Sequence, residues 1–427
     1  MKQLAIGYVL VVAMAVLAGC SKGSSEGPKG QLVGVQERPK WDHINPMGMV
    51  YIPSGEFTAG PGDQDLNNSM FQRPQAMSIQ GFYMDETEIT NNEYRQFVEY
   101  VRDSIAHTTL GHLIDKEDGS GQKIDWSVPL DWSSSSEDVQ ALGDMYYSGE
   151  DKFWGRQDLD VRKLKFAREW YDWKKAARKD IRNSGIPRST LIKKEETIIY
   201  PDTLVWVHDF AYSYNEPMTR NYFWHPAFDD YPVVGVNWVQ ANAFCSWRTK
   251  LWNDYQQEIG ETMGEEFRLP FEPEWEYASR GGKENAPYPW GGPYVRNRKG
   301  CLLANFKPGR GNYPEDGGFY TVRADSYFPN DFGLYNMAGN VAEWTSTAFY
   351  ENAYAFNHDM NGDIRRDSGS EDPETMKRKV LRGGSWKDVA YYIQTGTRSW
   401  EYQDTAKAYI GFRTALTFLG RSIDDKY

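Results

Sequence analysis

The feature that most limits how this chain can fold is the scarcity of long regular elements in its last third. From Pro289 to the C-terminus, Gly and Asn residues interrupt the sequence every few positions, and only a few short stretches have the pattern of strands. We therefore expect side-chain networks, buried Trp residues or bound cations to organise this part of the core. The whole chain is rich in aromatic residues, with 16 Trp and 28 Tyr.

The N-terminal segment predicts export. Lys2 precedes an almost unbroken apolar run from Leu4 to Ala18, which closes on Leu-Ala-Gly-Cys at Cys20. The run is shorter than the roughly 20 residues of a transmembrane helix and is typical of a secretory signal. Because its end resembles a lipobox, we expect residues 1–19 to be a signal peptide and the thiol of Cys20 to carry a lipid. An ordinary signal peptide with a chance cysteine, or a signal anchor, is the alternative.

The next segment predicts a flexible, lipidated tether at residues 20–45. From Ser21 to about Lys40 the chain is rich in Ser, Gly, Lys and Pro, and it has too few large apolar side chains to fold. No later segment is apolar enough to span a bilayer, and a core of the remaining length could form one large domain or two. The net charge of −12 gives no support for nucleic-acid binding.

Local patterns predict several helices and strands on either side of a long middle segment. Thr90 and Glu93 have the spacing of a capping box, and the apolar residues behind them follow helical spacing. Pro273 has the position of the first turn of another helix, with a glutamate on each side that favours its positive end. The expected strands lie within residues 49–57, where a Pro-Ser-Gly turn closes the strand, and within 76–84 and 233–236. The expected helices other than the one at Pro273 cover residues 91–105 and 239–257.

The middle of the chain, from about residue 103 to 230, has a different character. Residues 107–150 are polar and rich in Gly and Ser, which predicts loops, and residues 203–207 have the pattern of a strand. Residues 153–183 have a helical and strongly cationic pattern, with an expected buried stripe of Trp170, Trp173, Ala177 and Ile181. The cationic side predicts either a solvated face or a docking surface for an acidic partner. The residues of this candidate surface are Lys174, Lys175, Arg178 and Lys179.

Cysteine and histidine give little support for a metal site. After Cys20 only Cys245 and Cys301 remain, so the chain has at most one disulfide, or none. The six His residues are dispersed, and the spacing of the near pair, His107 and His112, does not place both side chains on one helical face. We expect neither histidine to be a metal ligand.

Several short sequence blocks along the chain resemble the formylglycine-generating enzyme (sulfatase-modifying factor) family. Nine such blocks follow the family's order, among them Glu88-Ile89-Thr90-Asn91, Gly339-Asn340-Val341-Ala342-Glu343-Trp344, Arg382-Gly383-Gly384-Ser385-Trp386 and Ile410-Gly411-Phe412-Arg413. The resemblance implies an α+β fold over residues 46–427, a variant of the C-type-lectin-like fold that is low in regular structure. Residues 103–230 would then be a large, partly helical insert.

The resemblance also bears on catalysis, because enzymes of this family oxidise a substrate cysteine with copper that a pair of cysteine thiolates holds. In the family these cysteines closely follow the Arg-Gly-Gly-Ser block. Here Asp388 and Ile393 stand at the matching positions, and neither Cys245 nor Cys301 lies near that block in sequence. The comparison predicts that the chain has no catalytic residues, binds no copper and is not an enzyme.

Calcium sites of the family map onto two sets of oxygen ligands. The first set consists of the side chains of Asn336 and Glu343 and the carbonyls of Gly339 and Val341. The second set consists of the side chains of Asn305 and Asp316 and the carbonyls of Phe306 and Gly318. Carboxylate and carbonyl oxygens suit a hard cation such as Ca²⁺. The resemblance therefore implies structural calcium, and the alternative is that these residues only hydrogen-bond the loops.

The insert has a narrower resemblance, to the gliding-motility lipoproteins of Bacteroidota. Residues 200–207 and 212–226 resemble the K-type lipoprotein of the type IX secretion system, and the J-type lipoprotein is the alternative. The resemblance implies a structural subunit that associates with itself and with the N-type partner protein in a periplasmic ring. It also implies a position on the periplasmic side of the outer membrane. A ligand-binding module, for example for glycan, and an active oxidase are the other functions that we weigh.

Overall fold

The computed structural model of the protein describes residues 44–62, 73–116, 119, 121–133, 136–209, 218–309, 311–369 and 371–420. All of them belong to one unit, His43–Tyr427. The expected signal peptide, Cys20 and almost all of the expected tether lie outside the described residues. Among the helices of the described part, none combines the length and the apolarity that a membrane span requires.

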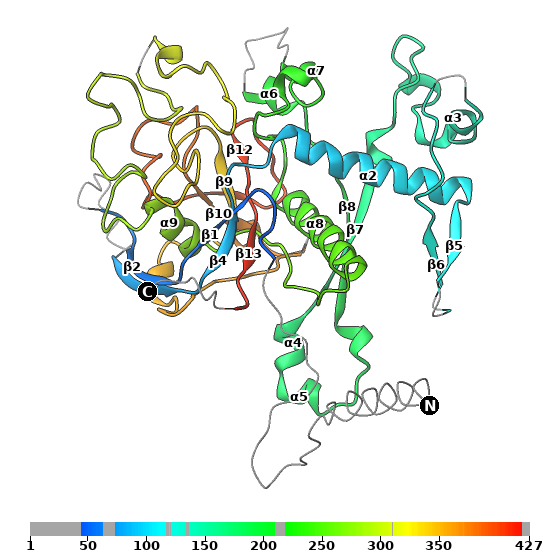
Figure 1. Ribbon diagram of the computed structural model, residues 1–427, viewed down its shortest axis with the longest axis horizontal. Helices are drawn as coiled ribbons and strands as arrows, with labels where there is room; N and C mark the ends of the chain where they lie inside the picture. The colour runs from blue at the N-terminus through cyan, green and yellow to red at the C-terminus, as the bar shows by residue number, and fades with distance from the viewer. Residues whose placement is uncertain are drawn as a thin grey trace, which may run out of the picture. The chain divides into compact units, whose positions relative to one another are not determined.

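Two small sheets form the centre of this unit (Figure 1). The first has the strand order β11-β10-β9-β12, with β12 parallel to β9 and the other pairs antiparallel. Its strands are β9 (Ala342–Ala348), β10 (Arg378–Arg382), β11 (Ser399–Tyr402) and β12 (Ile410–Gly411). The second sheet is antiparallel, has the order β1-β4-β13 and brings the two ends of the described chain together. Its strands are β1 (Met49–Ile52), β4 (Phe82–Asp85) and β13 (Ala415–Thr417).

The turn that closes the first expected strand is confirmed and is followed by a further strand, whereas the second expected strand is in fact a pair of strands separated by a turn. The expected strand within 49–57 contains β1 and most of β2 (Gly55–Ala59), and the one within 76–84 contains most of β3 (Gln75–Ile79) and of β4. The strands β2 and β3 pair with each other in a separate antiparallel sheet. The turns divide the apolar runs between two sheets, which is why one continuous strand does not form.

The three main helices confirm the local predictions. They are α2 (Asn91–Leu110), α8 (Trp238–Glu258) and α9 (Glu272–Arg280). The capping box at α2 is present: the Glu93 amide donates to Thr90 Oγ1 at 3.3 Å, and the Thr90 amide donates to Glu93 Oε2 at 2.8 Å. The helix is longer than expected and ends only at Gly111, whose φ of 75° is a left-handed cap. Pro273 lies in the first turn of α9, as predicted.

Side chains rather than long elements hold the loops between α9 and β9, as expected. The described residues between these two elements contain a single short 3-10 helix, η6 (Tyr313–Asp316). Trp275 and Trp344 are both 0 % exposed, and the indole N–H of Trp344 donates to the Val236 carbonyl at 3.0 Å. Truncating a buried Trp to Ala typically costs about 3–5 kcal/mol, so these rings stabilise a core that lacks long elements.

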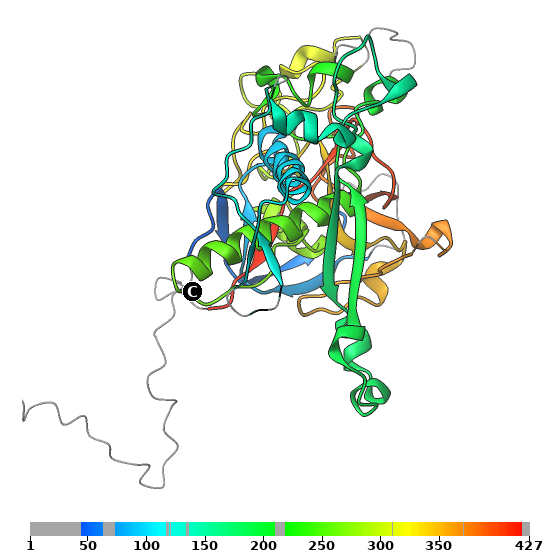
Figure 2. The same ribbon diagram turned by 90° about the vertical axis from the view of Figure 1, so that its right-hand side faces the viewer.

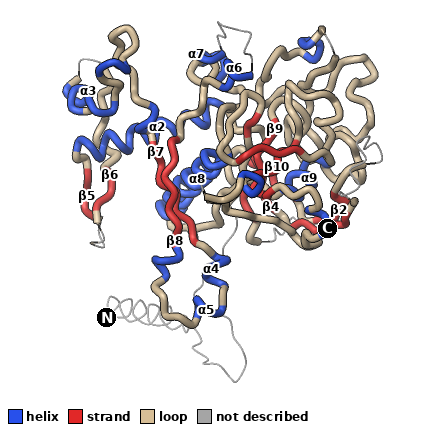
Figure 3. The backbone as a smooth tube through the Cα atoms, turned by 180° about the vertical axis from the view of Figure 1, so that it is seen from behind, coloured by secondary structure: helices blue, strands red, loops and turns tan. Residues whose placement is uncertain are grey.

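The largest correction concerns residues 153–183, which are not one helix. The cationic segment instead contains β7 (Lys165–Tyr171), which pairs antiparallel with β8 (Ile192–Ile198). The short helices α4 (Trp173–Ala177) and α5 (Lys179–Arg182) form the tip of this hairpin (Figure 2). In Figure 3 the hairpin lies in front of α8, and both of its strands contact that helix.

Strand periodicity explains this correction. The rings of Phe166 and Phe97 pack edge to face at 5.2 Å between centroids, so alternate residues of β7 face the helices. The expected buried stripe is also wrong, because the chain turns after β7 and leaves Trp173 75 % exposed.

Three further predictions in and after the insert are wrong or incomplete. Residues 203–207 are mostly helical, because α6 (Val205–Asp209) buries Val205 and Trp206 after a turn. Residues 233–236 form no strand: Gly235 adopts a φ of 76°, and an added Cβ there would lie 2.3 Å from the Asp202 carbonyl oxygen. The expected loop 107–150 contains the end of α2, the 3-10 helix η1 (Gly143–Met145), the start of η2 (Gly149–Asp151) and three other short elements. These are β5 (Leu113–Asp115), β6 (Gln122–Ile124) and α3 (Glu137–Ala141).

Candidate functional sites

The loop after β10 contains Asp388 and Ile393, which the family resemblance leads us to expect at the positions of its cysteine pair. Asp388 is half-buried, its carboxylate accepts a hydrogen bond of 2.6 Å from Ser385 Oγ, and its own amide donates to the Ser385 carbonyl at 2.9 Å. Burial raises the pKa of the Asp388 carboxyl above its usual value. Asp388 therefore closes a turn on its own loop.

Ile393 occupies the other position and is 0 % exposed. It belongs to an apolar cluster with Tyr288, Leu302, Ala304, Phe306 and Ala338. The neighbouring Gly384 has a φ of 65°, and a Cβ at that residue would lie 2.9 Å from Ile393 Cγ2. The two positions together offer one carboxylate and no second ligand atom. Among the described residues, no group of three or more His, Cys, Asp or Glu side chains could hold a metal ion.

A buried charge network fixes the start of this loop. Arg382 Nη2 pairs with Glu276 Oε2 at 2.5 Å, and Arg280 Nη2 pairs with Glu276 Oε1 at 2.6 Å. Burial raises the pKa of Glu276, but the two guanidinium groups outweigh burial and leave this pKa below its usual value. The carboxylate is therefore ionised, and it positions the Arg-Gly-Gly-Ser segment against α9.

The first expected calcium set does not fit a cation in the arrangement that the structure has. Arg413 forms a two-pronged pair with Glu343, with Nη2–Oε1 at 2.6 Å and Nε–Oε2 at 2.7 Å. The Trp275 indole N–H also donates to Glu343 Oε2 at 2.6 Å. Since both carboxylate oxygens face donors, and one donor is a cation, a Ca²⁺ ion next to Glu343 would be repelled. Asn336 presents its amide N–H₂ group, not its oxygen, to the neighbouring Glu88.

Glu88 is a buried carboxyl that the sequence marks only as part of a family block. It is 0 % exposed, and its Oε2 accepts from the amides of Asn336 and Asn340, each at 3.1 Å. Its Oε1 has no hydrogen-bond partner among the described residues. Burial, and then the negative charge of Glu343, raise the pKa of Glu88 to about 8, although Arg413 opposes this shift. Glu88 is therefore mostly protonated at neutral pH.

The second expected calcium set fits better. Asp316 is half-buried and accepts from the amide of Phe306 at 2.8 Å and from that of Gly318 at 3.2 Å. A Cβ at Gly318 would lie 3.1 Å from Asn305 Oδ1, so the four residues of the set meet at one place. Burial raises the pKa of Asp316, and no cationic side chain of the described residues forms an ion pair with it. These are oxygen donors of the kind that a hard cation prefers.

The four cations of the expected docking surface lie at the tip of the hairpin. Lys174 and Lys175 are in α4, Lys179 begins α5, and Arg178 connects the two helices; all four are exposed. Lys174, Lys175 and Arg178 face the body of the unit, where Lys174 Nζ donates to the Arg365 carbonyl at 2.7 Å. Lys179 does not line that region. The structure therefore divides the expected surface into two parts.

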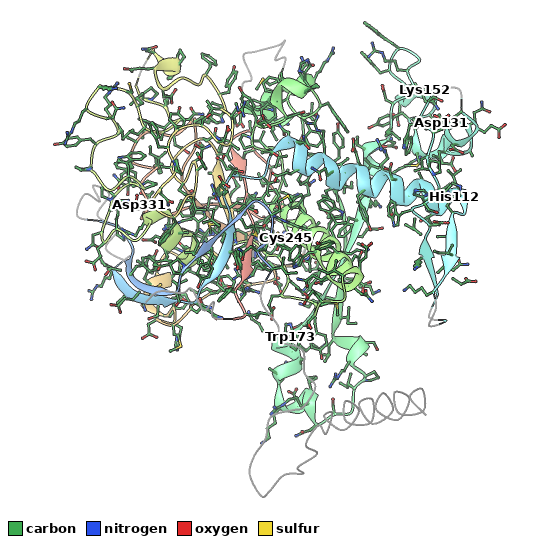
Figure 4. The ribbon with its side chains drawn as sticks, viewed as in Figure 1. His112, Asp131, Lys152, Trp173, Cys245 and Asp331 are labelled. Carbon is green, nitrogen blue, oxygen red and sulfur yellow. The ribbon has the colours of Figure 1, made fainter. Side chains whose placement is uncertain are left out.

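The cysteines and the histidine pair have no arrangement of a metal or redox site. Cys245 is buried in α8 (Figure 4) and Cys301 is exposed, and both are free thiols. Burial raises the pKa of Cys245 to about 12. His107 and His112 do meet, with 3.1 Å between their Nδ1 atoms, because the chain reverses at Gly111 and His112 lies beyond the helix. Helical spacing alone could not reveal this contact.

Comparison with known proteins finds relatives over most of the chain. Residues 35–418 match the family described as "Sulfatase-modifying factor enzyme 1-like domain". The formylglycine-generating enzyme of Bos taurus is 27 % identical over 380 residues, which cover 88 % of this chain and 76 % of that protein. The formylglycine-generating enzyme of Streptomyces coelicolor is 26 % identical over 373 residues, which cover 86 % of this chain and 88 % of that protein.

The similarity extends to a relative that is named as inactive. The inactive C-alpha-formylglycine-generating enzyme 2 of Bos taurus is 35 % identical over 193 residues, which cover 44 % of this chain and 50 % of that protein. Among solved structures, PvdO from Pseudomonas aeruginosa is similar with a TM-score of 0.48 and 16 % identity, over 87 % of this chain and 94 % of that chain.

Proposed function

This chain belongs to the sulfatase-modifying factor enzyme 1-like family, and from that premise we propose that it is a non-catalytic member that serves as a lipid-anchored structural subunit. The observation that carries the proposal is Ile393, which fills an apolar cluster at a position where the enzymes need a thiolate. Asp388, at the other position, is engaged by Ser385. The occurrence of both active and inactive relatives is compatible with this role.

The assay of formylglycine formation tests the non-catalytic role. The purified chain would be incubated with Cu(I), oxygen and a cysteine peptide that the family's enzymes oxidise, and the peptide mass would be followed. We expect no product and no tight copper binding, because one carboxylate cannot replace two thiolates. An active relative serves as the positive control, and formylglycine formation by this chain would overturn the proposal.

The more specific proposal is a K-type subunit of the type IX secretion and gliding machinery. We infer that the lipid on Cys20 holds it to the periplasmic side of the outer membrane, where it associates with itself and with the N-type partner in a ring. The resemblance of residues 200–207 and 212–226 and the exposed cations of the hairpin tip support this role. Recovery of the N-type protein from envelope membranes through a tag on this chain is the test. Recovery of partners of the J-type lipoprotein without the N-type protein would favour the alternative, in which this chain is the J-type lipoprotein.

We propose one structural Ca²⁺ ion at the second set, where Asn305, Phe306, Asp316 and Gly318 meet. A cation there would relieve the cost of burying the Asp316 carboxylate without a counter-charge. Calcium at 1 mM should raise the melting temperature of the native chain, and EDTA should reverse this effect. Asp316→Asn should remove the calcium effect, whereas Glu315→Gln, one residue away, should keep it; an equal response of both variants contradicts this site.

A ligand-binding module is the second candidate function, and one cavity favours it. A hollow of about 380 Å³ lies between α2 and the insert, and the rings of Tyr147, Tyr200 and Trp224 line it together with Glu99 and Arg102. Aromatic faces beside charged groups can stack on a sugar ring. Screening the native chain and Trp224→Ala against a glycan array tests this candidate. The candidate requires that the native chain binds a glycan and that the variant loses this binding.

A further inference from the structure

A basic hollow lies where the tip of the β7–β8 hairpin meets the body of the unit. Its volume is about 520 Å³, and its walls come from two segments, within residues 172–193 and 350–367. The hydrogen bond from Lys174 to the Arg365 carbonyl joins the two walls across 191 residues of sequence. Six cations line the hollow: Lys174, Lys175, Arg178, Lys193, Arg365 and Arg366. This concentration of positive charge contrasts with the net charge of −12 of the chain.

Only part of this positive charge is neutralised within the hollow. Its two carboxylates, Asp172 and Asp367, both face Lys193, at 3.3 Å and 3.9 Å. Lys175 forms no ion pair with any described residue. The one ion pair of Arg366 with a described side chain is 3.8 Å long, and its buried Nε has no partner there.

Two of the remaining three cations have acidic neighbours outside the hollow. Arg178 pairs with Asp180 at 2.8 Å, and Arg365 pairs with Asp363. Among the described residues, the Lys174 ammonium group forms no ion pair and has the carbonyl hydrogen bond described above. The excess positive charge is therefore centred on Lys174, Lys175 and Arg366, which belong to both walls.

We infer that the basic hollow is the docking site for an acidic peptide segment of a partner protein, with at least two carboxylates spaced along an extended chain. This inference rests on the proposed structural role and names the partner chemistry of the hairpin surface. Alternate residues of an extended strand are about 6.5–7 Å apart, so their carboxylates can reach cations on both walls. Because Lys174 already ties the walls together, little ordering is needed on binding.

The arrangement favours a peptide over a compact phosphate group. Phosphate sites gather backbone N–H groups or forked guanidinium groups on one point. Here the cations are spread over an open surface, and Asp172 and Asp367 lie among them, where they would repel a dianion. A peptide can place its carboxylates away from these two residues. Trp173 precedes Lys174 in α4, outside the lining of the hollow, and its 75 % exposed ring is available to an apolar side chain of the same segment (Figure 4).

Binding of a fluorescent hexaglutamate peptide to the full chain tests this inference. We expect Lys175→Glu and Arg366→Glu each to raise the dissociation constant at least tenfold in 50 mM salt, and higher salt to weaken binding to the native chain. Lys179→Glu is the matched control, because it makes the same charge change on the same hairpin tip but outside the hollow, and it should change binding less than twofold. Unchanged urea midpoints would establish that all three variants are folded.

Two results would overturn the inference. One is an absence of peptide binding, or an equal loss of binding in the control and the hollow variants. The other is displacement of the peptide by inorganic phosphate at a lower concentration than by unlabelled hexaglutamate, which would make the hollow a phosphate site. The proposed function fails separately, if the tagged native chain recovers no ring partner from envelope membranes. If Lys179→Glu prevents recovery of the ring partner and the two hollow variants do not, the partner binds the hairpin tip outside the hollow. The hollow is then excluded as its docking site.

Discussion

The central sheets and the β7–β8 hairpin use the same charged side chains in opposite environments. In the centre, Arg382 and Glu276 are both 0 % exposed and pair at 2.5 Å. On the hairpin, Lys194 and Glu169 also pair at 2.5 Å, but they are 69 % and 50 % exposed. A buried pair has lost its hydration and depends on its partner, whereas an exposed pair exchanges with water and salt. Two ion pairs of equal length can therefore contribute very differently to the stability of the fold.

This difference explains how charged pairs can stabilise the centre of the chain while the charges of the hairpin remain accessible to a second molecule. The central pairs support segments without regular secondary structure, because Arg382 also donates to the carbonyls of Thr395, Gly396 and Thr397 in the loop after β10. The hairpin is held by its strand pairing and by its packing on α8, so its charges are not needed for its fold. They can be used for a second molecule, and the following predictions test that division.

Glu276→Gln should have the largest effect. The substitution leaves the buried Arg280 without its carboxylate and Arg382 with only the longer pair of 3.5 Å to Glu272, and breaking a buried pair in this way costs about 3–5 kcal/mol. Urea unfolding of the native chain and the variant at pH 7, followed by circular dichroism, measures the difference. Glu169→Gln on the hairpin is the matched control and should change stability by less than about 0.5 kcal/mol. Similar losses of stability in the two variants would contradict the distinction between buried and exposed ion pairs.

Glu88→Gln should have an intermediate effect that depends on pH. The folded-state pKa of Glu88 is raised from 4.5 to about 8, so between these values the folded chain binds more protons than the unfolded chain. Stability therefore falls as the pH rises, by about 1.4 kcal/mol per pH unit for this group, because the buried carboxyl must stay protonated or be charged without compensation. Neutral Gln removes that dependence.

The measurement is urea unfolding of the native chain and Glu88→Gln at pH 5.5 and pH 7.0. Relative to the native chain, the variant should gain about 2 kcal/mol between these two values. Glu343, with its bound Arg413, and the amides of Asn336 and Asn340 face the group and are unchanged in both proteins. A difference that does not vary with pH would show that Glu88 is ionised in the folded state.

Local signals in the sequence were enough for the three main helices, α2, α8 and α9. The capping box at Thr90 and the position of Pro273 act within one turn, so they specify α2 and α9 whatever surrounds them. The β7–β8 hairpin could not be predicted, because the partner of β7 begins about 20 residues after β7 ends, and the cations between them suit a helix as well as a tip. The choice depends on the contact of Phe166 with Phe97, which is a tertiary interaction.

For the candidate sites too, the sequence predicts some features and only the complete fold reveals the others. The sequence identifies Asp388 and Ile393 because both follow a recognisable block, but it does not reveal that Ile393 is enclosed by apolar residues. It also suggests Glu343 as a calcium ligand, although Arg413, 70 residues further on, holds both carboxylate oxygens. Pairing of buried charges depends on the complete fold. Ligand sets taken from a motif alone are therefore least secure where an arginine from a distant segment of the chain can reach them.

The pair of Lys194 and Glu169 should give the smallest effect, and it is the most direct test of the comparison. A double-mutant cycle with Lys194→Ala and Glu169→Ala should give a coupling energy of about 0.2–1 kcal/mol at low salt, because both side chains are mostly hydrated. In 1 M salt the coupling should vanish, since the Debye length falls to about 3 Å. A coupling above about 2 kcal/mol would mean that the hairpin depends on its charges as the centre does. Its cations would then be structural rather than available to a partner.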